Sequence, residues 1–145
     1  MGCRKRPGLL RDAMREADLR PIQILYVEDN ADVRDMVIEI IENADRRVVA
    51  CANAETAWQQ LQMAAFDVLV TDVSLPGCSG TELARRWLKA DASRWVILFS
   101  GYDFKSGLAS LGANVRAIPK EDFAQLEQTL VEIGLHLQLC AGRRS

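Results

Sequence analysis

Short apolar runs alternate along the chain with longer segments in which apolar residues recur every three or four positions. The runs hold four to six residues each, a length typical of strands. They lie at Ile22–Val27, Arg47–Cys51, Val68–Thr71, Trp95–Phe99 and Val115–Ile118. Because most of these runs are apolar on consecutive residues, the strands are expected to be covered by helices on both faces.

Five helices are predicted between and after the strands from the spacing of apolar residues. Four of them cover residues 31–44, 53–65, 79–90 and 103–111, and the last helix carries Phe123, Leu126, Leu130, Ile133 and Leu137. The first of them places Val33, Val37, Ile40 and Ile41 on one face. Asn53 and Ser79 stand at N-cap positions, and Glu82 gives Ser79 the spacing of a capping box. Strict alternation of strand and helix predicts an α/β fold, a doubly wound five-stranded parallel sheet with five helices on both faces.

The chain is predicted to form one domain. Its 145 residues suit a single hydrophobic core. Residues 1–21 lie outside the alternating pattern and form an N-terminal extension, either one helix ended by Pro21 or a disordered segment. Residues 22–145 form the domain itself.

Composition narrows the classes of function. Apolar residues make up 49% and charged residues 26% of the chain, as in an ordinary globular domain. The net charge of −2 argues against a nucleic-acid partner. No apolar run is long enough for a membrane span, and the first residues lack the apolar core of a signal peptide. Four scattered cysteines and a single histidine, His136, favour reduced thiols in the cytoplasm over a zinc site or a disulfide framework.

Polar residues follow four of the five predicted strands. Glu28 and Asp29 come after the first strand, Asp72 after the third, Ser100 after the fourth and Lys120 after the fifth. Ligands of open parallel sheets bind at the carboxyl ends of the strands. These side chains are therefore expected to meet at one edge of the sheet.

Three acids at one edge repel one another. Two charges about 5 Å apart, at an effective dielectric constant near 20, cost about 3 kcal/mol. A hard divalent cation with oxygen ligands would offset this repulsion, and Mg²⁺ suits a site with few carboxylates. A phosphoryl group bound there would have both Mg²⁺ and Lys120 as counter-charges, and Ser100 would donate a hydrogen bond to it.

Each of these residues also has an ordinary interpretation. An aspartate at a strand end is often a turn former or a helix N-cap. In the ordinary interpretation, the segment from Glu28 to Asn30 only begins a helix, with Asn30 as its N-cap. Lys120 alone would be a solvated surface lysine. The joint pattern of acid pair, acid, hydroxyl and lysine on four strand ends is what indicates a site.

The four motifs together resemble those of response-regulator receiver domains of two-component signalling, in particular the single-domain, chemotaxis-regulator-like members. The matching stretches are "LYVEDN", "VTDVSLPGCSG", "ILFSG" and "AIPK", and the resemblance covers about residues 22–139. It implies a flavodoxin-like sheet with strand order 2-1-3-4-5.

The resemblance also implies roles for the site residues. Asp72 would accept a phosphoryl group from the phosphohistidine of a sensor histidine kinase or a histidine phosphotransfer protein. Asp29 and Asp72 would bind Mg²⁺ together with the backbone carbonyl of Ser74, and Glu28 would act through a metal-bound water. Lys120 would contact the phosphoryl oxygens.

The resemblance also implies how the protein signals and which residues tune the lifetime of its phosphorylated state. Ser100 would move to the phosphoryl group, while Ser74 and Tyr102 stand where family members tune the lifetime of the phosphorylated state. The protein would catalyse only its own phosphorylation and dephosphorylation, and it would not otherwise be an enzyme. Since no output module follows the pattern within these residues, it is expected to signal through phosphorylation-dependent binding of a protein target that the sequence leaves open.

One alternative is a receiver-like binding module that works without phosphorylation. Many receivers have an aromatic residue three positions before the lysine and a proline after it, where this chain has Ala117 and Glu121. A second alignment places Arg116 at the aromatic position. A phosphatase of the haloacid dehalogenase type is disfavoured, because Ser74 occupies the position of its second aspartate.

Overall fold

The computed structural model describes residues 21–73, 75, 79–100, 112–120 and 122–144. The side chains of Ser100 and of residues 139–144 lie outside this description. The predictions for the N-terminal extension up to residue 20, for the helix over 103–111, and for Ser74 and Tyr102 therefore fall outside the described residues.

Five strands form one sheet in the order β2-β1-β3-β4-β5, and all neighbouring strands are parallel. They are β1 (Ile22–Val27), β2 (Arg46–Cys51), β3 (Val68–Asp72), β4 (Trp95–Ser100) and β5 (Val115–Pro119). The predicted fold class and strand order are confirmed, and each predicted strand is correct to within one residue at either end.

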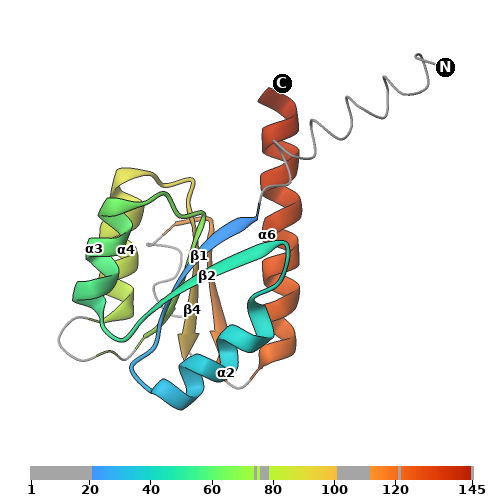
Figure 1. Ribbon diagram of the computed structural model, residues 1–145. Helices are drawn as coiled ribbons and strands as arrows, with labels where there is room; N and C mark the ends of the chain where they lie inside the picture. Colours follow the sequence, from blue (N-terminus) through green and yellow to red (C-terminus); the bar gives the residue numbers. More distant parts are fainter. Residues whose placement is uncertain (1–20, 74, 76–78, 101–111, 121, 145) are drawn as a thin grey trace.

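Four helices are present in the described part of the chain, two on each face of the sheet (Figure 1). They are α2 (Ala31–Ile41), α3 (Ala54–Met63), α4 (Gly80–Ala90) and α6 (Phe123–Arg144). Helices α3 and α4 cover one face, while α2 and α6 cover the other. None of the described helices has the length and apolarity that crossing a membrane requires.

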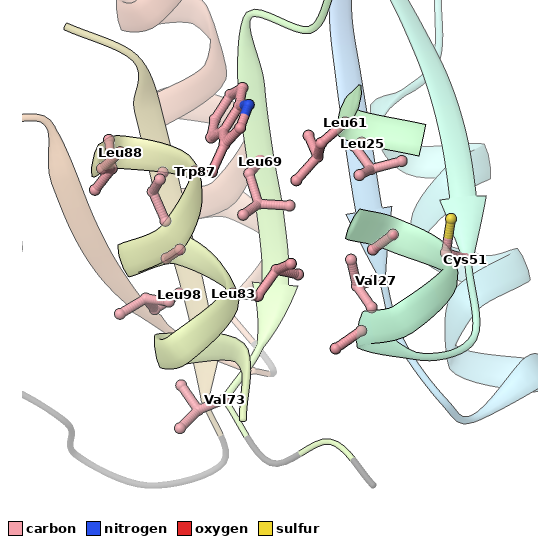
Figure 2. Packing of buried hydrophobic residues seen from close by; sticks show 14 of the residues in the cluster. Leu25, Val27, Cys51, Leu61, Leu69, Val73, Leu83, Trp87, Leu88 and Leu98 are labelled. Atoms are coloured by element: carbon pink, nitrogen blue, oxygen red, sulfur yellow. The ribbon is translucent and has the colours of Figure 1, made fainter. Parts of the chain in front are cut away.

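Side chains alternate between the two faces along each strand, so the sheet separates two hydrophobic cores. The core under α3 and α4 includes Leu25, Val27, Leu61, Leu69, Leu83, Trp87 and Leu98 (Figure 2). The core under α2 and α6 includes Ile24, Tyr26, Val37, Ile41, Val70, Ile97, Phe99, Leu126 and Leu130. This burial on both faces makes the strands a rigid support for the residues at their ends.

Helix ends follow the predicted capping chemistry. The Asn53 side chain accepts a hydrogen bond from the backbone N–H of Thr56 at 2.8 Å, and Ser79 Oγ accepts one from Glu82 N–H at 3.1 Å. These bonds satisfy N–H groups that the first turn of a helix leaves without an intrahelical partner. Both predicted N-caps are therefore confirmed.

One residue of the predicted inner face of α2 is not buried. Val37 and Ile41 are fully buried, but Ile40 is 37% exposed. Successive helical residues are about 100° apart, so Ile40 falls at the edge of a stripe centred on its neighbours. The apolar character of Ile40 alone did not predict that its side chain would be exposed.

The structure places one cysteine and confirms that His136 is a surface histidine. Cys51, the one cysteine whose side chain is described, is a buried free thiol. His136 lies on the exposed side of α6, and its ring packs edge-on against the ring of Trp95, with centroids 5.3 Å apart. His136 is thus a surface histidine rather than part of the strand-end site.

A buried arginine links β2 to α6. Arg46 is 5% exposed, and its guanidinium donates two hydrogen bonds to the two carboxylate oxygens of Glu127. These hydrogen bonds lower the pKa of Glu127, although partial burial opposes the effect. The stabilisation from this pair is thus complete above the ordinary glutamate pKa and is lost as the pH falls through the lowered pKa of the folded state.

We expect Glu127→Ala to lower the free energy of unfolding by about 2 kcal/mol at neutral pH, because it leaves a buried cation without its acceptor. Glu132→Ala, at an exposed position of the same helix, is the matched control and should change it by no more than about 0.5 kcal/mol. Urea denaturation measures both. Equal midpoints for the two variants would show that the pair contributes nothing.

Candidate functional site

The carboxyl ends of the central strands bring three acids and a lysine together. Strands β1 and β3 are neighbours and pair Val27 with Thr71, so the residues that follow them are adjacent. One carboxylate oxygen from each of Glu28, Asp29 and Asp72 lies within 4.8 Å of the others. The predicted meeting of these acids at one edge of the sheet is confirmed.

Glu28 is the most enclosed of the acids and is fully buried. Its Oε2 accepts hydrogen bonds from the backbone N–H of Asn30 at 3.2 Å and from Lys120 Nζ at 3.3 Å. Its Oε1 lies 3.0 Å from the same Nζ, which is an ion-pair contact without hydrogen-bond geometry. Burial raises the pKa of Glu28, while the lysine and the Asn30 N–H act in the opposite direction.

Lys120 joins two of the acids. Its Nζ donates a hydrogen bond of 2.8 Å to Asp72 Oδ2 and also contacts Glu28. Partial burial lowers the pKa of Lys120, but the hydrogen bonds and charges of the two acids outweigh burial and raise the pKa overall. Lys120 is therefore protonated at neutral pH, and its single charge faces three acids.

The start of α4 packs directly against the end of β3. The Gly80 N–H donates a hydrogen bond to the Val73 carbonyl at 2.9 Å. A Cβ atom on Gly80 would lie 2.0 Å from the Asp72 backbone oxygen and 2.8 Å from Thr71 Oγ1. Only glycine allows this approach, so Gly80 helps to determine where the Asp72 backbone lies.

Helix α2 begins immediately after the acid pair. Asn30 caps it by accepting a hydrogen bond from the Val33 N–H at 3.1 Å, and Arg34 Nη1 donates to the Glu28 carbonyl at 2.8 Å. The same short segment therefore starts a helix and carries two acids of the site. The role of Arg34 was not predicted, since nothing in its spacing distinguishes it from other helical arginines.

Tyr26 is a second residue that the sequence did not single out. It is fully buried in the core under α2 and α6, two residues before Glu28, which follows the end of β1. Burial, followed by the charges of Glu28 and Asp72, raises the pKa of its hydroxyl above the ordinary range. The hydroxyl is therefore a permanent hydrogen-bond donor close to the acids.

The other predicted site residues that the structure describes lie on β4 and β5. The backbone of β4 ends at Ser100, which pairs with Pro119 immediately before Lys120. The hydroxyl of Ser100 lies outside the described side chains. Ala117 is half-buried, whereas Arg116 is exposed and lies over the Trp95 ring at 5.3 Å.

The donor set fits Mg²⁺. All three acids offer oxygen, the ligand that a hard cation prefers, and ligand atoms around one Mg²⁺ lie at most about 4.2 Å apart. The acid oxygens, which lie within 4.8 Å of one another, are close to this separation. Asp29 is exposed, so one side of the cluster is open to solvent.

Residues 24–128 match the family model of the response regulator receiver domain. This match covers most of the chain, and the sheet order and strand-end acids agree with it. The chain therefore belongs to the receiver-domain family of two-component response regulators.

Curated relatives support this assignment. The response regulator receiver protein CpdR from Brucella abortus is 32% identical over 80 residues, which cover 55% of this chain and 67% of CpdR. The virulence transcriptional regulatory protein PhoP from Salmonella typhimurium is 30% identical over 96 residues, covering 64% of this chain and 43% of PhoP. The chain thus spans about two thirds of CpdR and less than half of PhoP.

Solved structures show the same fold. The N-terminal domain of an uncharacterized protein from Wolinella succinogenes is 28% identical with a TM-score of 0.70, covering 82% of this chain and 98% of that domain. The response regulator TrrA from Thermotoga maritima has a TM-score of 0.70 and 24% identity, covering 77% of this chain and 98% of TrrA. At that identity, the likeness to TrrA supports the fold alone.

Proposed function

We propose that Asp72 is the phosphoacceptor of this receiver domain and that the domain signals through the phosphorylated state. The main support is the contact of 2.8 Å between Lys120 Nζ and Asp72 Oδ2 within a cluster of three acids. In this arrangement the carboxylate that would act as the nucleophile lies beside a fixed cation and two further acids that could hold Mg²⁺. An aspartate that only capped a turn would need neither a neighbouring cation nor two further acids.

In the proposed reaction, an Asp72 carboxylate oxygen attacks the phosphorus of a partner's phosphohistidine. The P–O bond forms while the P–N bond breaks, and the imidazole leaves with the electron pair and takes up a proton. The product is an aspartyl phosphate, an established covalent intermediate of carboxylate nucleophiles. Lys120 neutralises charge on the transferred oxygens, which is the main requirement of a loose phosphoryl-transfer transition state.

Glu28, Asp29 and Asp72 would hold the Mg²⁺ ion, with the Ser74 carbonyl completing the protein ligands and Glu28 acting through a bound water. When bound, Mg²⁺ supplies positive charge that offsets the charge of the acids and of the phosphoryl group. The roles of Ser100 as the switch hydroxyl and of Ser74 and Tyr102 in tuning the lifetime remain part of this proposal.

The proposed partners are a sensor histidine kinase or a histidine phosphotransfer protein and a downstream protein target. Phosphohistidine is made from ATP, so we place the chain in the cytoplasm. Residues 22–145 would form the receiver domain, with residues 1–21 as an N-terminal extension. Beyond its own phosphorylation and hydrolysis of the resulting acyl phosphate, the domain would have no enzymatic activity.

The proposal predicts that the protein gains a single phosphoryl group when it is incubated with Mg²⁺ and acetyl phosphate. Intact-mass spectrometry should detect the adduct, and chelation of Mg²⁺ should prevent it. Asp72→Asn should lose the adduct, because the amide is a poor nucleophile. The control is Asp45→Asn, at an exposed position beside the start of β2, which should behave like the unmodified protein.

Two results would contradict the proposal. An adduct that persists in Asp72→Asn would place the phosphoacceptor elsewhere. Absence of an adduct with both small donors and a histidine kinase would favour the phosphorylation-independent binding module.

A further inference from the structure

Two buried polar atoms beside the site have no hydrogen-bond partner. Among the described side chains these are the Tyr26 hydroxyl and Glu28 Oε1. Both residues are fully buried. Buried polar groups are nearly always paired, and leaving one without a partner costs about 1–3 kcal/mol. Two such atoms at one site therefore indicate a loose contact that becomes a full hydrogen bond in another state of the protein.

The two atoms are complementary. The tyrosine hydroxyl is a donor, and the carboxylate oxygen is an acceptor. Tyr26 lies on β1, and Glu28 directly follows that strand, where its N–H still donates a hydrogen bond of 3.0 Å to the Cys51 carbonyl of β2. Two residues apart in extended backbone, their side chains leave the same face of the sheet. Glu28 raises the pKa of the Tyr26 hydroxyl through its charge and through a weak hydrogen-bond interaction, so the two groups are near each other, although their contact does not reach full hydrogen-bond geometry.

Lys120 currently compensates Glu28. Its Nζ lies 3.0 Å from Oε1 and 2.8 Å from Asp72 Oδ2. In the proposed function, a phosphoryl group on Asp72 recruits this lysine. Glu28 then loses its ion pair while remaining buried, and a buried carboxylate without a partner is strongly destabilising.

We propose that Tyr26 is a positioning residue of the phosphorylation site, whose loose contact with Glu28 tightens to a full hydrogen bond from the hydroxyl to Glu28 Oε1 when Lys120 moves to the phosphoryl group. Tyr26 does not touch the reacting atoms in this scheme. It holds Glu28 in place for its water-mediated contact with Mg²⁺. This inference rests on the proposed phosphorylation of Asp72.

The test compares two affinities of Tyr26→Phe by isothermal titration calorimetry. The affinity for Mg²⁺ alone should stay within twofold of the unmodified protein, because Lys120 still pairs with Glu28 in that state. The affinity for beryllofluoride in the presence of Mg²⁺ should fall about tenfold, as expected when a residue that orients a metal-site carboxylate is lost. A general loosening of the core would lower both affinities together.

A spectroscopic measurement examines the hydrogen bond itself. The chain has two tyrosines, so the ¹³Cζ resonance that disappears in Tyr26→Phe is that of Tyr26. In the unmodified protein this resonance should shift when Mg²⁺ and beryllofluoride are added together and should not shift with Mg²⁺ alone. The control for loss of a buried hydroxyl is Thr129→Val on α6, which should leave both affinities unchanged.

The outcomes separate the inference from the proposed function. If the unmodified protein binds beryllofluoride and Tyr26→Phe binds it equally well, the role of Tyr26 is wrong and the phosphoacceptor proposal stands. A ¹³Cζ resonance that does not respond to beryllofluoride would also overturn that role. If the unmodified protein does not bind beryllofluoride with Mg²⁺, the proposed function fails, and the role of Tyr26 fails with it.

Discussion

Gly80→Ala is expected to lower the free energy of unfolding by about 3 kcal/mol, near the upper end for an added methyl group in a packed site. The new Cβ would lie 2.0 Å from the Asp72 backbone oxygen, a contact that neither backbone can relieve without moving α4 or the end of β3. Such movement would displace Asp72 relative to Lys120. Urea denaturation should show the loss of stability, and phosphorylation by acetyl phosphate should slow in the same variant.

Gly134→Ala is the matched control for this substitution. Gly134 lies within α6, and its added Cβ would meet only the terminal methyl of Ile22, at 3.0 Å. That methyl ends a flexible side chain, while alanine is favoured over glycine inside a helix by about 1 kcal/mol. We therefore expect little net change in stability. If Gly80→Ala were equally harmless, the packing of α4 against β3 would not determine the position of Asp72.

Lys120→Met is expected to slow phosphorylation of Asp72 at least about a hundredfold, a typical cost of removing one electrostatic contact to a transition state. The substitution keeps much of the side-chain length but removes the charge that contacts both Asp72 and Glu28. Phosphorylation by acetyl phosphate, followed by intact-mass spectrometry over time, measures the rate. Lys120→Arg preserves the charge and should retain more activity than the methionine variant.

The same variant separates two roles of the lysine. Without Lys120, the fully buried Glu28 loses its ion pair, so the free energy of unfolding should fall by about 3 kcal/mol. Mg²⁺ should bind more tightly than to the unmodified protein, because the ammonium charge no longer repels the cation or contacts Asp72. Weaker Mg²⁺ binding in Lys120→Met would contradict the view that the lysine and the metal share these carboxylates.

The strands and the site acids were predictable because each is recognised from a short stretch of consecutive residues. Each buried parallel strand is a short apolar run, and the fold rule that brings strand ends to one edge then placed Glu28, Asp72 and Lys120 together. The resemblance to receiver domains added the strand order. Nothing more than the order of residues was needed for these conclusions.

Features that depend on three-dimensional packing were not predictable in this way. Tyr26 resembles any aromatic residue of a buried strand until its hydroxyl is located beside Glu28. Ile40 belongs to an apolar stripe but lies at its edge, because only the neighbouring α6 and the sheet determine where the stripe is covered. The need for glycine at position 80 follows from the approach of the Asp72 carbonyl, which no spacing reveals.

The most direct test of the central claim is to locate the phosphoryl group within the chain. Borohydride reduces an aspartyl phosphate to homoserine, a change that peptide mass spectrometry assigns to a single residue. After phosphorylation by a histidine kinase or acetyl phosphate in the presence of Mg²⁺, we predict homoserine at position 72 and at no other aspartate. Homoserine at another position, or none after phosphorylation by a competent donor, would contradict the assignment of Asp72 as the phosphoacceptor.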